Sequence, residues 1–237
     1  MGCTDMSEAG IYVKNDNNEL LLNATYNNLY LFRKIKLTDL PYEELSRTGT
    51  LAFATPIQEN EVVAAIARTG GGALQAFSVR MVQWIIYAPR TGQSSTSALL
   101  ADLDDVYVYI FGINTSTETQ AHGYGLQVFD ENGVCVYNSN NKPMRVLHYA
   151  NNISDSDTAD AILDGYIVPS NKVCAIYNCA ISRIAGGAGQ SRPIYFLNAY
   201  ISNSGEVRQQ NTPFGFAPFN FVMGDYIGYM VVDVTGY

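Results

Sequence analysis

The two histidines, His122 and His148, are the side chains best suited to acid–base chemistry or metal binding near neutral pH. A Ser-His-Asp triad would need a serine on a Gly-x-Ser-x-Gly turn, and the sequence contains no such turn. Neither histidine has a second His or Cys at the spacing of a zinc site. We therefore predict surface or turn histidines, no catalytic residue and no metal site.

Aspartates form two groups that could bind a cation or act as an acid pair. One group precedes an apolar run and the other opens a polar segment: Asp102, Asp104 and Asp105, then Asp155, Asp157 and Asp160. The second group resembles the start of a calcium loop, but the Gly and Glu that complete an EF-hand are missing. Carboxylates of a glycosidase are paired in space, and nothing in the sequence singles out a pair. We expect helix caps or solvated acidic loops.

Glycine-rich stretches at residues 70–72 and 186–189 could suggest phosphate cradles. A P-loop needs Gly-Lys-Ser/Thr at the start of a helix, and a dinucleotide fold needs GxGxxG after a strand. Neither context is present, so these stretches are predicted to connect strands, and no cofactor is expected. The cysteines, Cys3, Cys135, Cys174 and Cys179, lack a CxxC spacing and are interpreted as free structural thiols.

The charge of the chain excludes several classes of partner. The 237 residues carry a net charge of −8, and only 15% of them are charged. Nucleic-acid binding needs clustered Lys and Arg, and the nearest approach is the short run Arg33–Lys36. No apolar stretch is long enough for a transmembrane helix, and the first residues lack the apolar core segment of a secretory signal. We predict a soluble protein made in a cytoplasm, with no nucleic acid and no membrane insertion.

The elements that would position these residues are strands, and the clearest of them occur twice. Residues Gly125–Asn138 hold two short apolar runs around the turn Asp-Glu-Asn-Gly, which predicts a β-hairpin. Residues Gly10–Asn23 repeat the spacing 115 positions earlier, with Asn18 in the place of Gly133. This repetition indicates that one β-module occurs twice in the chain.

The remaining segments can also be paired between the two copies. Short apolar runs broken by Gly, Pro and Asn predict strands, and two polar segments predict one or two helical turns each. Strands are expected at 29–37, 51–55, 61–67, 76–87 and 105–111 in the first copy and at 143–149, 165–168, 172–180, 193–201 and 225–231 in the second. Helical turns are expected at 39–45 and 154–163, and loops at 90–98 and 203–219.

The sequence thus predicts an all-β protein with few short helices, built from two tandem antiparallel β-sandwich-like modules that arose by internal duplication. We expect a flexible arm at residues 1–9, modules at 10–114 and 123–237, and a linker at 115–122. Two domains in series and two modules sharing one sheet are both compatible with the sequence.

A phenylalanine-rich segment of the second copy has no counterpart in the first. Residues 212–221 contain four Phe and two Pro, and either cover the core or pack into a neighbouring subunit. We favour a subunit interface formed by Phe214, Phe216, Phe219 and Phe221. Trp84 lies between apolar residues within a predicted strand, so a core position is favoured over an exposed sugar-stacking one.

The second hairpin resembles a motif of small tail-associated proteins of tailed bacteriophages. Residues 124–139, followed by Pro143–Leu147, are similar to the opening of those β-sandwich proteins, and Gly10–Asn23 is a looser version. The resemblance implies a non-enzymatic virion structural protein of the tail (tip, collar or fibre attachment) with no catalytic residues. We therefore expect a homo-oligomer that contacts other virion tail proteins. A carbohydrate-binding module that recognises a host surface glycan and a capsid decoration protein are the alternatives.

Overall fold

A computed structural model describes residues 12–14, 20–23, 29–45, 49–68, 74–79, 82–90, 93–113, 126–129, 135–154, 161–180, 192–217 and 226–237. Almost every regular element is an antiparallel strand, so the predicted all-β class is confirmed. Apolar runs interrupted by Gly, Pro and Asn account for this, because they give short strands separated by turns.

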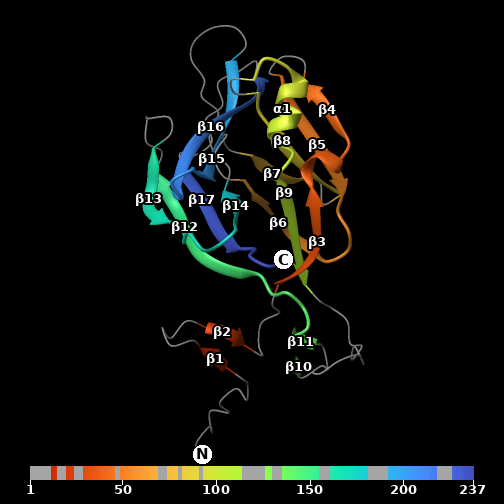
Figure 1. The fold of residues 1–237 in the computed structure, drawn as a ribbon, viewed down its shortest axis with the longest axis vertical. Coiled ribbons are helices and arrows are strands. Elements are labelled where there is room, and N and C mark those ends of the chain that lie inside the picture. Colours follow the sequence, from red (N-terminus) through yellow and green to blue (C-terminus); the bar gives the residue numbers. More distant parts are fainter. Residues whose placement is uncertain are drawn as a thin grey trace, which may run out of the picture.

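A six-stranded sheet runs through both halves of the chain, so the two halves share one sheet (Figure 1). Its strand order is β12-β17-β14-β6-β9-β3, and Ile66 of β6 lies opposite Ile176 of β14 where the halves meet. Its strands are β3 (Leu29–Lys36), β6 (Glu61–Ala67), β9 (Tyr107–Ile113), β12 (Arg145–Ser154), β14 (Cys174–Ala180) and β17 (Tyr226–Asp233).

Each half adds a smaller sheet of its own. The first has the order β4-β5-β8-β7 and the second the order β13-β16-β15. Their strands are β4 (Tyr42–Leu45), β5 (Thr50–Pro56), β7 (Gln75–Val79), β8 (Gln83–Ala88), β13 (Ile162–Ile167), β15 (Arg192–Ile201) and β16 (Glu206–Ala217). The order β5-β8-β7 in the first half corresponds to β13-β16-β15 in the second. Strand β4 has no counterpart among the described residues of the second half.

The two predicted hairpins are present and have the same register. They are formed by β1 (Tyr12–Lys14) with β2 (Leu20–Asn23), and by β10 (Gln127–Phe129) with β11 (Cys135–Asn138). Tyr12 lies opposite Asn23, and Gln127, 115 positions later, lies opposite Asn138. The order of the sheet strands also matches between the halves, whereas their origin by duplication stays a prediction.

Three apolar clusters hold the layers together. One cluster fills the space between the two sheets of the first half, where Phe53, Ile86 and Ile110 are fully buried, and a second fills the same space in the second half. The third lies on the opposite face of the six-stranded sheet and takes Ala65 and Ala175 from both halves. The central strands are therefore buried on both faces, which explains their almost continuous apolar sequences.

Several predicted elements are wrong in kind. The segment predicted as helical turns at 39–45 holds a 3-10 turn (Leu37–Asp39) and then β4, because β4 gains a hydrogen-bonding partner in β5. The helical turns expected at 154–163 overlap β12 and β13, and residues 155–160 lie outside the described residues. The loop expected at 90–98 contains the start of helix α1 (Thr96–Asp102), which Ser95 caps by accepting a hydrogen bond from the Ala98 amide.

Two predicted strand boundaries are also wrong. The single strand expected at 76–87 is the hairpin β7–β8, in which Val79 lies opposite Gln83. The loop expected at 203–219 contains the long strand β16, which pairs with β15 along its length, with one register shift between Ile194 and Tyr195. In both cases tertiary pairing decides the structure, because turn residues alone do not reveal how far a strand extends. The predicted arm at 1–9 and linker at 115–122 lie outside the described residues.

A buried carboxylate ties together the two sheets of the first half. Glu61 of β6 has a fully buried side chain and accepts hydrogen bonds from Arg33 Nε at 2.6 Å and from Trp84 Nε1 at 3.1 Å. Arg33 also donates to Glu61 Oε2 and to the Pro56 carbonyl. Trp84 is 4% exposed, which agrees with the predicted core position. The carboxylate thus links β3, β6 and β8 in a water-excluded site.

We expect Glu61→Ala to lower the free energy of unfolding by about 3 kcal/mol, because it removes the charged partner of Arg33 and the acceptor of the Trp84 indole. Chemical denaturation measures the change. Glu59→Ala, in the exposed turn before β6, is the matched control and should lie within about 0.5 kcal/mol of the wild type. Equal effects of the two substitutions would contradict a structural role for the buried carboxylate.

Candidate functional site

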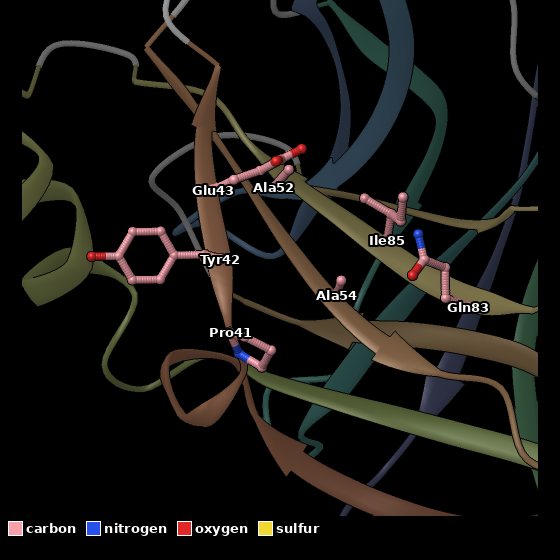
Figure 2. Close-up of a pocket in the computed structure, with 7 residues that line it drawn as sticks. All are labelled: Pro41, Tyr42, Glu43, Ala52, Ala54, Gln83 and Ile85. Atoms are coloured by element: carbon pink, nitrogen blue, oxygen red, sulfur yellow. The ribbon is translucent and has the colours of Figure 1, made fainter.

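A shallow trough of about 300 Å³ lies on the small sheet of the first half (Figure 2). Three neighbouring strands, β4, β5 and β8, and the residue before β4 supply its lining, which consists of Pro41, Tyr42, Glu43, Ala52, Ala54, Gln83 and Ile85. Figure 2 shows the Tyr42 ring directed away from the other lining side chains. Tyr42 lies opposite the buried Phe53, with ring centroids 5.5 Å apart, so its ring belongs to the core side of the sheet.

The trough is formed by rows of opposed residues on the outer face. In one row Ala52 lies between Glu43 and Tyr87, and in the next Ala54 lies opposite Ile85. The alanines of the central strand form a low floor, and the longer side chains of β4 and β8 form the walls. Because neighbouring strands are about 4.8 Å apart, the two walls stand roughly 10 Å apart.

The electrostatics of the trough are set by one carboxylate. Glu43 is exposed, and the lining residues that the structure describes include no Lys, Arg or His. Burial, followed by the nearby charge of Glu43, raises the pKa of Tyr87. The hydroxyl therefore stays protonated at neutral pH and can donate a hydrogen bond. The trough combines an apolar floor with a charged acceptor and the polar amide of Gln83.

A second polar cluster joins strands β12, β13 and β17 in the second half of the chain. His148 Nε2 of β12 lies 2.5 Å from Asp164 Oδ2 of β13, and the buried Tyr229 hydroxyl donates to the other oxygen of Asp164. The His148 ring is stacked on Tyr166, with centroids 4.1 Å apart. These contacts connect the edge strand of the six-stranded sheet to the edge strand of the small sheet.

Opposing effects act on the Asp164 carboxyl. Burial pushes its pKa upward, but hydrogen bonds from Tyr229 and His148 outweigh burial and leave the pKa below its ordinary value. Burial and the Asp164 contact raise the pKa of Tyr229. An ionised Asp164 therefore belongs to the folded state. His148 lies within strand β12 and not in a turn, and its side chain is 26% exposed although its ring is stacked and paired. A His–Asp pair 16 residues apart has no spacing signal that sequence reasoning could have used.

The same edge exposes apolar side chains, which we call the edge surface. Its four members are 47–62% exposed and come from β12 and β13: Val146, Tyr149, Ile162 and Ile167. In the six-stranded sheet, β12 pairs only with β17, and β13 is at the end of its small sheet. Both strands lie together at one side of Figure 1.

The predicted interface residues are only partly placed. Phe214 and Phe216 fall in β16, where Phe216 lies opposite Pro193, and nothing further is described of their side chains. Phe219 and Phe221 lie outside the described residues, as does His122. The interface formed by these phenylalanines stays a prediction.

The predicted acid groups and thiols have structural partners or burial. Asp102 pairs with Arg68 and Asp104 with Lys36, so these aspartates do not converge on one point. Asp155, Asp157 and Asp160 lie outside the described residues, as do the glycine spacers at 70–72 and 186–189. Cys135, Cys174 and Cys179 are free, and burial raises the pKa of Cys174 and of Cys179 to about 11. Neither of these two thiols is a thiolate at neutral pH.

Two other features are absent from the described part of the chain. No group of three or more His, Cys, Asp or Glu side chains is arranged to hold a metal ion. No helix has the length and apolar character needed to cross a membrane. Comparison of the chain with protein-family models, with curated proteins and with solved structures finds no match.

Sequence reasoning missed the trough and the edge surface for a physical reason. The trough depends on β4 lying beside β5, and β4 falls in the segment that was expected to be helical. The alternation of small outward and large inward residues in Leu51–Ala54 was a usable signal, because it marks a strand whose outer face is low.

We expect Asp164→Asn to lower the free energy of unfolding by about 1–2 kcal/mol at pH 7, through loss of the charged acceptor. A depressed carboxyl pKa stabilises the fold above the unfolded value of about 3.8, and this stabilisation is lost as the pH falls through the lower folded value. The difference between wild type and variant should therefore shrink below about pH 4. Denaturant unfolding at several pH values measures this difference, with the exposed Asp105→Asn as the control. A difference that is constant down to strongly acidic pH would count against the ionised pair.

Proposed function

We propose that this chain is a non-enzymatic structural protein of a tailed-phage virion, a component of the tail tip, collar or fibre attachment. It acts by assembling with copies of itself and with other virion tail proteins. The observation that carries the assembly part is the edge surface, where four large apolar side chains stay about half exposed on neighbouring edge strands. Exposed apolar residues that are grouped in this way favour a protein contact.

The geometry of the edge favours packing of side chains over extension of the sheet. Strand β12 has register shifts between Val146 and His148 and between Ala150 and Ile153. Strand β13 shifts register between Ile162 and Ile167. Bulges of this kind disfavour addition of a further strand. A partner would therefore contact Val146, Tyr149 and the two isoleucines through their side chains.

The phage part of the proposal rests on the resemblance of the second hairpin to tail-associated proteins. Support comes from the antiparallel pairing of Gln127–Phe129 with Cys135–Asn138, the two strands of the hairpin that carries this resemblance. The Asn138 amide of this hairpin donates to the buried Tyr30 hydroxyl of β3, at 3.0 Å. The hairpin is therefore attached to the sandwich by a specific contact, as expected for a structural part. The predicted location, in the tail of the virion, follows from the same resemblance.

A second candidate function, carbohydrate binding in host attachment, is favoured by the trough on β4, β5 and β8. Trp84 cannot serve this function, because it is buried and bonded to Glu61. A capsid decoration protein remains the other alternative to a tail component, and the edge surface would serve in either location.

We expect the purified 26.0 kDa chain to form a discrete homo-oligomer, measured by size-exclusion chromatography with light scattering. The double substitution Tyr149→Asp and Ile167→Asp should weaken the assembly at least about tenfold, because it places charges in an apolar contact. Val82→Asp is the matched control, since Val82 is 66% exposed in the turn between β7 and β8. A wild type that is monomeric at every concentration tested would contradict self-assembly, and an equal effect of the control would contradict this location.

A further inference from the structure

We propose that the trough on β4, β5 and β8 binds an uncharged pyranose unit of a glycan and discriminates against acidic sugars. The proposal rests on carbohydrate binding, the second candidate function, and is independent of the assembly through the edge surface. It assigns the contact to Glu43, Ala54, Gln83 and Ile85, none of which the sequence singled out.

The shape of the trough suits a ring that lies flat on the sheet. Ala52 and Ala54 follow each other along the outer face of β5 and have no long side chains. Ala54 is partly exposed and forms the accessible floor, whereas Ala52 is 5% exposed. Pro41 and Ile85 extend the apolar surface to either side, next to Ala54. An apolar floor of this width accepts the carbon–hydrogen face of one sugar ring. A volume of about 300 Å³ is at the small end of ligand sites, which suits one unit of a longer chain.

Polar groups stand where they could reach the hydroxyls at the rim of such a ring. Glu43 on the β4 wall offers two carboxylate oxygens, which accept hydrogen bonds from neighbouring hydroxyls. Gln83 on the β8 wall offers an amide that donates and accepts. Figure 2 shows both side chains on opposite sides of the alanine floor. Donors and acceptors on both walls match hydroxyl groups, which play both roles.

The charge of the trough restricts the class of sugar. Among the described lining residues Glu43 is the one charged side chain, and none of them carries a positive charge that could pair with a ligand carboxylate. The nearby Arg90 is already bonded to Glu44 and Thr96, on the core side of β4. Sialic and uronic acids would therefore meet uncompensated negative charge, whereas a neutral hexose or an N-acetylhexosamine would not.

The strand that forms one wall also marks this site as specific to the first half. The small sheets of the two halves share the arrangements β5-β8-β7 and β13-β16-β15, and β4 is added only to the first among the described residues. Glu44 of β4 accepts hydrogen bonds from Thr96 and Arg90, so the strand is fixed to the start of α1. The wall that carries Glu43 is thus held in place before any ligand arrives.

Titration calorimetry of the full chain tests the proposal with two panels of oligosaccharides. The neutral panel is built from glucose, galactose, mannose and N-acetylglucosamine, and the acidic panel consists of oligogalacturonates and sialyllactose. We expect calorimetry to detect binding of a neutral sugar. In an NMR titration with the same sugar, the amide chemical-shift changes should be confined to β4, β5 and β8. Ala54→Leu, at a half-exposed position, should fill the trough and weaken binding at least about tenfold.

Glu43→Gln should weaken neutral-sugar binding about tenfold and reduce the discrimination against acidic sugars, because it removes the charge. Glu59→Gln, exposed and outside the trough, is the matched control and should bind like the wild type. If Ala54→Leu binds sugar as tightly as the wild type, the assignment of this site is overturned, but carbohydrate binding by the chain is not. No binding by any sugar would overturn both. Tighter binding of acidic sugars, or of a basic peptide at the trough, would overturn the ligand class.

Discussion

The antiparallel contact between β6 and β14 is the constraint on which the rest of the structure depends. Each strand belongs to a different half of the chain, and Ile66 lies opposite Ile176 where they meet. Ile66 contributes to the core of the first half and Ile176 to the core of the second. On the other face, Ala65 and Ala175 belong to one common cluster. Packing on both faces of the join makes the two halves parts of one body.

A join at the centre of the sheet determines which surfaces are left for partners. The inner strands of the six-stranded sheet have no free edge, so the surfaces left for partners include the end strands β12 and β13 and the outer faces of the small sheets. The edge surface and the trough occupy two such places. The network around the buried Glu61 and the network around the partly exposed Asp164 both hold strands together.

The sequence predicted the class of fold and the hairpins, because both depend on local signals. Alternating apolar residues and Asn-rich turns are sufficient to identify Gly125–Asn138 as a hairpin. The sharing of one sheet, the strand β4 and the His148–Asp164 pair depend on contacts between distant residues, which leave no spacing pattern. The trough was missed because its floor is two alanines, Ala52 and Ala54. Their side chains carry no chemical group that marks a site, and the residues opposite them are known only from the strand pairing.

Scanning calorimetry tests most directly whether the shared sheet makes the halves one body. A single cooperative unit gives one transition whose calorimetric and van't Hoff enthalpies agree. Phe53→Ala in the first core and Val231→Ala in the second should both lower the temperature of that one transition. Two transitions, each lowered by only one of these substitutions, would contradict the account.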